Sequence, residues 1–238
     1  MSTENKIYPL FSYPVMIYGE TFSLTHETEY IKNLKYIKNY GNRRSQQSNI
    51  LNHAPLASLK KFLMRGLNDY AYKFLNIDKK INQIYITQSW SNVTIRGETH
   101  HPHVHTNSII SGVFYLEGDK TPIEFHRLDK IFPLTLNYKS FDIHNAEHWW
   151  VQIELGKVFL FPSALQHSVV VNETDTPRVS IAFNTFVSGR MGEEGNSNLL
   201  HCKSMNPKIY DTPDFKKDVK PFGIESGYSI TRASKKLP

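Results

Sequence analysis

The chain has few of the features that stabilise secreted or membrane-bound proteins. Its one cysteine, Cys202, cannot form an intrachain disulfide, which favours a reducing compartment. No apolar run approaches the roughly 20 residues of a membrane-spanning helix. Residues 1–14 lack the charged and then apolar order of a signal peptide. We therefore expect a soluble cytoplasmic protein without a membrane partner, folded as one domain over residues 1–238.

The charge of the chain is concentrated in one segment. The formal net charge is +6, but residues 32–80 alone carry eleven Lys and Arg against two Asp and Glu, while residues 81–187 carry seven against ten. The basic segment has no array of aromatic residues on its polar side, so its lysines are best explained as the solvent face of helices. We do not expect a nucleic-acid partner, although the sequence leaves one open, as it leaves a homodimer open.

Residues 1–80 are predicted to hold a strand and helices. Thr25 is a suitable N-cap, and Tyr30, Leu34 and Ile37 follow at helical spacing until Gly41, which predicts a first helix over this stretch. A second helix is predicted after Pro55. Its apolar stripe consists of Leu59, Leu63, Leu67, Tyr70 and Phe74.

From Ile81 the apolar period changes to two, which is typical of strands. The predicted strands are 81–90, 108–117, 121–127, 148–154, 157–162, 166–172 and 178–186. Short strands separated by turns indicate an antiparallel barrel, and the histidine pattern below favours a double-stranded β-helix, the jelly-roll or cupin-like barrel, with the N-terminal helices packed on it. We expect the connection 128–147 and an irregular extension, 188–238, to shape the substrate pocket.

Histidines cluster at two places in the predicted barrel, 100–105 and His167. Alternation along a strand would put His101, His103 and His105 on one face and His100 on the other. An H-x-H pair can place two imidazoles on one metal ion, and a third ligand from a distant strand completes the set. The spacings Gly97-x5-His-x-His and Gly156-x5-Pro-x4-His resemble the two cupin motifs, but the cupin glutamate and the second motif's last glycine are missing. The other histidines considered show no partner pattern, and we expect them on the surface or in the core: His53, His126, His144 and His148.

Arg178 and Ser180 are two residues apart on a predicted strand and therefore point the same way. A buried Arg is costly unless it meets an anion, and a guanidinium beside a hydroxyl is a good partner for a carboxylate. The alternative is an Arg that closes the barrel mouth in a salt bridge.

Residues 90–186 resemble the Fe(II)/2-oxoglutarate-dependent oxygenases, in particular a microbial and phage branch with H-x-H…H and R-x-S motifs. The matching elements are Gly97, His103, His105, Ser111–Leu116, Gly156, Phe161-Pro162, His167, Arg178, Ser180 and Asn184. The resemblance implies iron held by His103 and His167, with His105 at a position where the family usually has an acid. It also implies that Arg178, with Ser180 and Tyr115, binds the distal carboxylate of 2-oxoglutarate; otherwise Tyr115 is a core aromatic residue.

The implied activity is oxidation of an unknown prime substrate, with 2-oxoglutarate and O₂ as cosubstrates and succinate and CO₂ as products. No catalytic residue beyond the metal ligands is implied. Three other readings stay open at this stage. They are a three-histidine cupin-type dioxygenase that does not use 2-oxoglutarate, a zinc hydrolase, and a metal-free binding barrel.

Overall fold

The computed structural model describes residues 6, 8–20, 24–118, 121–193 and 195–203. All of them belong to the unit Met1–Ser204, and the second unit, Met205–Pro238, lies outside the described residues. None of the described helices is both long and apolar enough to cross a membrane.

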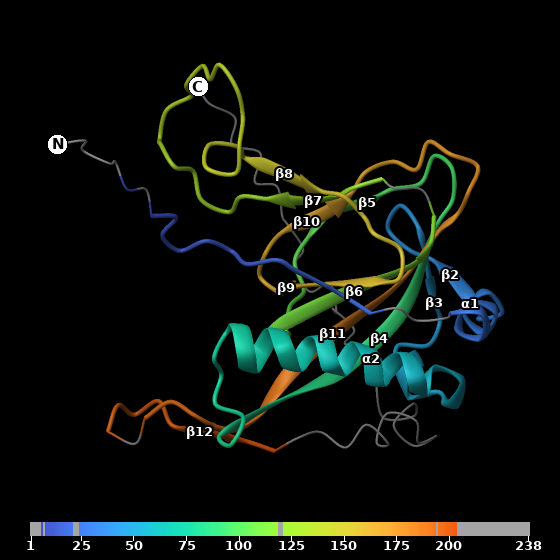
Figure 1. Ribbon diagram of the computed structural model, residues 1–238, viewed down its shortest axis with the longest axis horizontal. Coiled ribbons are helices and arrows are strands. Elements are labelled where there is room, and N and C mark those ends of the chain that lie inside the picture. The colour runs from blue at the N-terminus through green and yellow to red at the C-terminus, as the bar shows by residue number, and fades with distance from the viewer. Residues whose placement is uncertain (1–5, 7, 21–23, 119–120, 194, 204–238) are drawn as a thin grey trace, which may run out of the picture. The chain divides into compact units, whose positions relative to one another are not determined.

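Two antiparallel sheets form the body of this unit (Figure 1). The major sheet has the order β1-β9-β6-β11-β4-β3-β2, with β12 paired to β11, and the minor sheet has the order β5-β10-β7-β8. The strands of the major sheet are β1 (Met16–Gly19), β2 (Tyr36–Lys38), β3 (Arg43–Ser45), β4 (Asn82–Thr94), β6 (Ile110–Glu117), β9 (Lys157–Pro162), β11 (Arg178–Met191) and β12 (Leu200–Cys202). Those of the minor sheet are β5 (His100–His103), β7 (Ile123–His126), β8 (His148–Val151) and β10 (His167–Val169). Each of the seven predicted strands corresponds to one of these strands.

Helix α2 (Ala57–Asn68) covers one face of the major sheet and continues as a π-helical segment, Asp69–Phe74 (Figure 1). The predicted stripe is buried from Leu59 to Tyr70 and joins a cluster that includes Ile181 and Phe183 of β11. Phe74, the last residue of the stripe, is 57% exposed, although its ring stacks on that of Tyr70. The stripe thus attaches the helix to the central strand of the sheet. Two short 3₁₀ turns precede the helix, at Ile50–Asn52 and Ala54–Leu56.

The first predicted helix is wrong over its second half. Helix α1 (Thr25–Lys32) begins with Thr25 as its first helical residue, with Leu24 in the cap position, and ends well before Gly41. The following residues form the hairpin β2–β3, and Gly41 has a φ of +90° between these strands, a conformation that favours glycine. Tertiary structure is the reason, because β3 pairs with β4. The backbone of this segment therefore forms its hydrogen bonds within the sheet instead of within a helix.

The expectation of irregular structure from Ser188 onward is also wrong for part of the extension. Strand β11 runs on to Met191, and β12 pairs with its end. The reason is that β4 begins at Asn82, and its first residues pair with the end of β11 at Gly189. Residues 204–238 of the predicted extension lie outside the described residues.

A second core fills the space between the two sheets. It contains residues from both: Val113, Tyr115, Ile123, Phe125, Phe159, Phe161 and Ala182. Because side chains alternate along β11, Ile181 and Phe183 pack with α2, whereas Ser180 and Ala182 face the inside of the barrel. The alternation therefore directs one row of β11 residues, beginning at Arg178, into the interior.

Candidate metal centre and cosubstrate pocket

Three histidines meet where β5 and β10 pair. His103 lies opposite His167 in the register of these strands, and His105 follows two residues after β5. The ring centroids of His103 and His167 are 4.3 Å apart, and Nε2 of His105 lies 3.2 Å from Nε2 of His167. One ligand atom from each of the three residues lies within 4.8 Å of the others. The three side chains that the sequence singles out can therefore reach a single ion.

The backbone orients two of these imidazoles. Nδ1 of His103 lies 2.8 Å from the carbonyl oxygen of His101, and Nδ1 of His167 lies 3.1 Å from that of Leu165. A carbonyl can only accept, so Nδ1 donates in both rings and Nε2 keeps the lone pair that a metal requires.

Burial makes the three imidazoles neutral at physiological pH. It lowers the pKa of His105 to about 4, and it lowers the pKa values of His103 and His167 as well. The neighbouring His103 imidazole also lowers the pKa of His105, whereas a side-chain hydrogen bond with Asn184 opposes the shift. A neutral imidazole is the form that binds a metal, so the donor set fits a divalent transition metal such as iron or zinc.

Carboxylates do not take part in this cluster among the described residues. Glu98, one of the nearest acids in the sequence, accepts hydrogen bonds from Nε of Arg43 and from the backbone N–H of Ile95. Asp119, the other, lies outside the described residues. The related oxygenases usually have an acidic ligand at one of the three ligand positions, as the resemblance implies. In this chain the residue there is His105.

The alternation predicted for the histidine run is wrong. His100 lines the same pocket as His103 and His105, with its ring stacked 4.3 Å from that of His103, whereas His101 does not line the pocket. The cause is an irregularity in the pairing. His103 lies opposite His167 and His100 opposite Val169, so three steps on β5 match two on β10. This bulge shifts the strand's facing by one residue.

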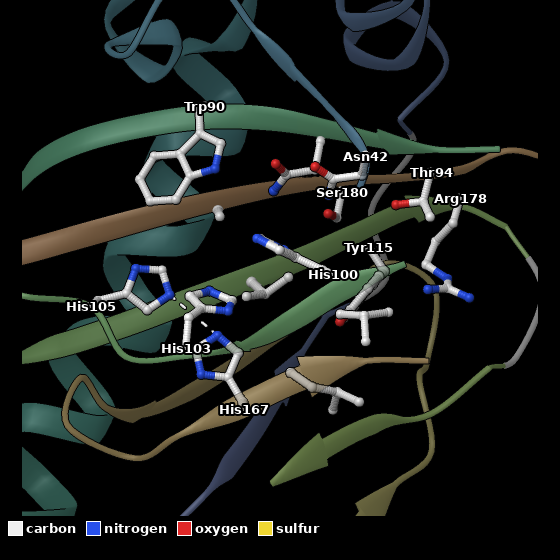
Figure 2. A pocket seen from close by; sticks show the side chains of 15 residues that line it. Asn42, Trp90, Thr94, His100, His103, His105, Tyr115, His167, Arg178 and Ser180 are labelled. Carbon is white, nitrogen blue, oxygen red and sulfur yellow. Dashed lines mark hydrogen bonds between the residues drawn. The ribbon is translucent and has the colours of Figure 1, made fainter. Parts of the chain in front are cut away.

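Arg178 lies at the other end of the pocket, with 3% of its surface exposed. In the register of the major sheet it lies opposite Thr94, while Ser180 lies opposite both Tyr115 and Asn92. Figure 2 shows these side chains lining one pocket with the three histidines. The sheet thus brings together the residues proposed for cosubstrate binding.

Two polar atoms in the pocket have no hydrogen-bond partner among the described residues: the hydroxyl of Tyr115 and Oδ1 of Asn92. The tyrosine is 1% exposed, and burial raises its pKa, although the nearby Arg178 cation opposes the shift. An unsatisfied buried hydroxyl costs about 1–3 kcal/mol. A hydroxyl beside a guanidinium fits the carboxylate of a bound cosubstrate, which would accept a hydrogen bond from the Tyr115 hydroxyl.

Sequence reasoning missed several residues of this pocket. Trp90, Asn92 and Thr94 of β4 line it, and the ring centroids of Trp90 and His105 are 5.8 Å apart. Asn184, which the resemblance includes without a role, lies behind the pocket lining, where its side chain hydrogen-bonds His105 and accepts a hydrogen bond of 3.1 Å from Ser111 Oγ. Trp90, Asn92 and Thr94 are two residues apart on β4, which pairs with β11. Strand alternation could therefore have placed them on the face that carries Arg178 and Ser180.

The free space between the metal-binding histidines and Arg178 is small. The pocket holds a cavity of about 30 Å³, which is room for about two water molecules. The ring of His100 lies between the two ends in the view of Figure 2. A cosubstrate that spans the pocket therefore requires this ring to move.

The sequence of the barrel matches a known family. Residues 88–184 fit the family described as "Putative 2OG-Fe(II) oxygenase", where 2OG is 2-oxoglutarate. The barrel segment of this chain is thus similar to the 2OG-Fe(II) oxygenases. The chain is accordingly an oxygenase that depends on Fe(II) and 2-oxoglutarate, and the predicted resemblance is confirmed. The matched segment runs from β4 into β11 and contains every metal and cosubstrate residue considered above.

Solved structures agree with the fold of this oxygenase. SnoN, a non-heme alpha ketoglutarate dependent epimerase from nogalamycin biosynthesis, is 11% identical over 81% of this chain and 87% of its own, with a TM-score of 0.51. SnoK, a carbocyclase from the same biosynthesis, is 10% identical over 81% and 89%, also with 0.51. HygX from Streptomyces hygroscopicus, solved with nickel and 2-oxoglutarate, is 12% identical over 72% and 82%, with 0.48. No curated protein sequence matches the chain. The likeness to SnoN and SnoK confirms the predicted double-stranded β-helix.

Proposed function

We propose that His103, His105 and His167 bind the Fe(II) of this oxygenase, and that Arg178, Ser180 and Tyr115 bind the distal carboxylate of 2-oxoglutarate. The observation that carries this proposal is the composition of the pocket. At one end lie three neutral imidazoles within reach of one ion. At the other lies a buried guanidinium beside a tyrosine hydroxyl for which the described part of the chain offers no hydrogen-bond partner. These are the two chemical groups that a metal-chelating dicarboxylate requires.

We further propose that the reaction is hydroxylation of a C–H bond of the prime substrate. Bound Fe(II) would supply the redox chemistry that couples decarboxylation of 2-oxoglutarate, with O₂, to oxidation of the substrate, giving succinate and CO₂. The protein's own part is positioning. Arg178 and Ser180 would fix the far carboxylate and thereby set the near end of the cosubstrate against the histidines.

The apolar walls of the pocket serve the same chemistry by excluding water. Val113, Ile123 and Ala182 line the pocket together with the polar residues. A dry environment strengthens the interaction between Arg178 and a carboxylate, since the effective dielectric constant is lower than in water. It also limits access of water to the reacting groups.

The metal assignment is tested by anaerobic titration of the apoprotein with Fe(II) and 2-oxoglutarate, followed by the visible charge-transfer band of the ternary complex. We expect His105→Ala to lose iron binding and His101→Ala, its neighbour that does not line the pocket, to retain it. Iron binding that persists in His105→Ala contradicts the three-histidine site. Failure of the iron-loaded wild type to form succinate from 2-oxoglutarate would refute the proposed reaction.

The cosubstrate assignment is tested with Arg178→Ala. Losing a charge-assisted pair with a carboxylate should raise the Kd of 2-oxoglutarate by roughly 10- to 100-fold, corresponding to about 1.4–3 kcal/mol. Arg96→Ala is the matched control, because Arg96 pairs with Asp175 on the surface at 3.0 Å. Equal affinity in the two variants would show that Arg178 does not bind the carboxylate.

A further inference from the structure

A second cluster of metal-binding side chains lies on the minor sheet. His126 and His148, which the sequence led us to expect without partners, lie opposite each other on β7 and β8, and Glu124 is two residues before His126. One ligand atom from each of the three lies within 4.8 Å of the others. The sequence shows no partner pattern for these two histidines because their partners come together only when β7 and β8 pair.

The cluster lies on the opposite face of the minor sheet from the iron site. In the register of β10 with β7, Ser168 lies opposite Glu124, and His167 lies opposite Phe125. Successive strand residues face opposite sides, so Ser168 and Glu124 point away from the interior that holds His167 and Phe125. The two histidine clusters are thus separate sites.

Ser168 orients His126 in the way expected of a residue that supports a metal ligand. Its Oγ donates to Oε2 of Glu124 at 2.8 Å, which uses its only proton. Nε2 of His126, at 2.8 Å from the same Oγ, must then be the donor. This leaves Nδ1 of His126 with its lone pair, and this nitrogen faces Nδ1 of His148 at 2.9 Å.

We propose that Glu124, His126 and His148 bind Zn²⁺. Zinc takes imidazole and carboxylate ligands at about 2.0–2.2 Å, so tetrahedral geometry separates its ligand atoms by about 3.3 Å. The two Nδ1 atoms are 2.9 Å apart, and Nδ1 of His148 is 3.4 Å from Oε1 of Glu124. Small adjustments from this arrangement suffice. Three protein ligands leave one position for water, and His148, with 48% of its side chain exposed, opens the site to solvent.

The zinc would join the two ends of the long loop between β7 and β8. His126 is the last residue of β7 and His148 the first of β8, so the ion bridges residues 22 positions apart. Arg127 already ties the loop by donating to the carbonyl oxygens of Ile143, His144 and Ala146. The loop lines an open pocket of about 630 Å³, and both histidines also line it. A clip at this point would stabilise the cavity wall.

Zinc binding is tested by counting equivalents in the chelator-treated full-length protein with a chromophoric competitor. We expect His148→Ala to bind one equivalent fewer than the wild type, whether or not the iron site also takes zinc. His144→Ala is the matched control, since His144 lies in the same loop outside the cluster and should keep the wild-type count. An equal count in wild type and His148→Ala overturns the proposal.

Ser168→Ala provides a milder test that keeps all three ligands. Losing the group that orients His126 should weaken zinc at this site by roughly 10- to 100-fold. The role as a clip is tested by limited proteolysis: zinc should slow cleavage within 127–147 in the wild type but not in His148→Ala. Zinc that binds without protecting the loop would overturn the structural role, and unchanged affinity in Ser168→Ala would contradict the ligand arrangement.

Discussion

At the scale of single residues, this oxygenase keeps groups in its pocket that cost stability in the absence of a ligand. Tyr115 is buried with its hydroxyl lacking a hydrogen-bond partner among the described residues. His100 lines the same pocket, with its ring stacked on that of His103. Both features are expected when a pocket is shaped for a bound group, because the ligand then supplies the missing interactions.

Tyr115→Phe should separate binding from stability. Without 2-oxoglutarate, removing the unsatisfied hydroxyl should stabilise the protein by about 1 kcal/mol. The Kd of 2-oxoglutarate should rise by about tenfold, since one hydrogen bond to a charged group is lost. Denaturant unfolding and the iron titration measure the two effects.

Tyr36→Phe is the control for this substitution. The Tyr36 hydroxyl lies 3.0 Å from the Ile31 carbonyl and 2.9 Å from Ser91 Oγ, so its loss should destabilise the protein by about 1 kcal/mol and leave 2-oxoglutarate binding unchanged. If Tyr115→Phe were destabilising to the same degree, the hydroxyl would have a partner in the unliganded protein.

His100→Ala should bind 2-oxoglutarate several-fold more tightly than the wild type. The neutral ring, whose pKa is lowered to about 3 mainly by burial, stacks on His103 and must be displaced by the cosubstrate. Removing it removes that cost. Calorimetric titration of the metal-loaded protein measures the change, and weaker binding in the variant would mean that His100 itself contacts the cosubstrate.

At the scale of elements, the pairing of β6 with β11 determines the pocket, because it places Tyr115 opposite Ser180. The same register places Gly112 opposite Phe183, and the fully buried Phe183 ring lies close over the glycine. A Cβ at Gly112 would come within 2.2 Å of Phe183 Cζ. The absence of a side chain is therefore required for the two strands to pack with α2.

Gly112→Ala should accordingly destabilise the protein by about 1–3 kcal/mol, because the Phe183 ring must shift in a packed core. The expected fall in Tm is several degrees for a domain of this size. Gly195→Ala, where the added methyl group meets no atom within 4 Å, serves as the control and should change Tm little. Similar Tm values for both variants would contradict the close packing of β6 on β11.

At the scale of the whole molecule, buried tyrosines predict a loss of stability in alkali. Burial raises the pKa of Tyr70 and of Tyr115 well above the ordinary value of 10. Above pH 10 the unfolded chain loses these phenolic protons while the folded protein keeps them. The ionisation of these two groups therefore leaves the free energy of unfolding unchanged below pH 10 and lowers it as the pH rises further.

Denaturant unfolding between pH 9 and 11.5 measures this decrease. Tyr70→Phe and Tyr115→Phe should each reduce the proton dependence by up to one proton, whereas a substitution of the exposed Tyr40, which is 79% exposed, should not. An alkaline slope unchanged by both core variants would mean that these hydroxyls ionise in the folded protein as they do in the unfolded chain.

The local pattern of the sequence was sufficient for much of this structure. A period of two predicted each of the seven strands, and helical spacing predicted α2, because these patterns reflect which side chains face a core. His103, His105 and His167, and likewise Arg178 with Ser180, were singled out by their spacing and by the family resemblance, and the structure places them around one pocket. The histidines belong to motifs of fixed spacing, and Arg178 and Ser180 lie two residues apart on one strand.

Tertiary structure decided what depends on partners distant in the sequence. Residues around Ile37 became a hairpin because β4 offered an edge, and the bulge against β10 turned His100 into the pocket and His101 away from it. The cluster of Glu124 with His126 and His148 exists only through the pairing of β7 with β8. Spacing along a chain specifies which side chains can share a face, but register between strands determines which of them meet.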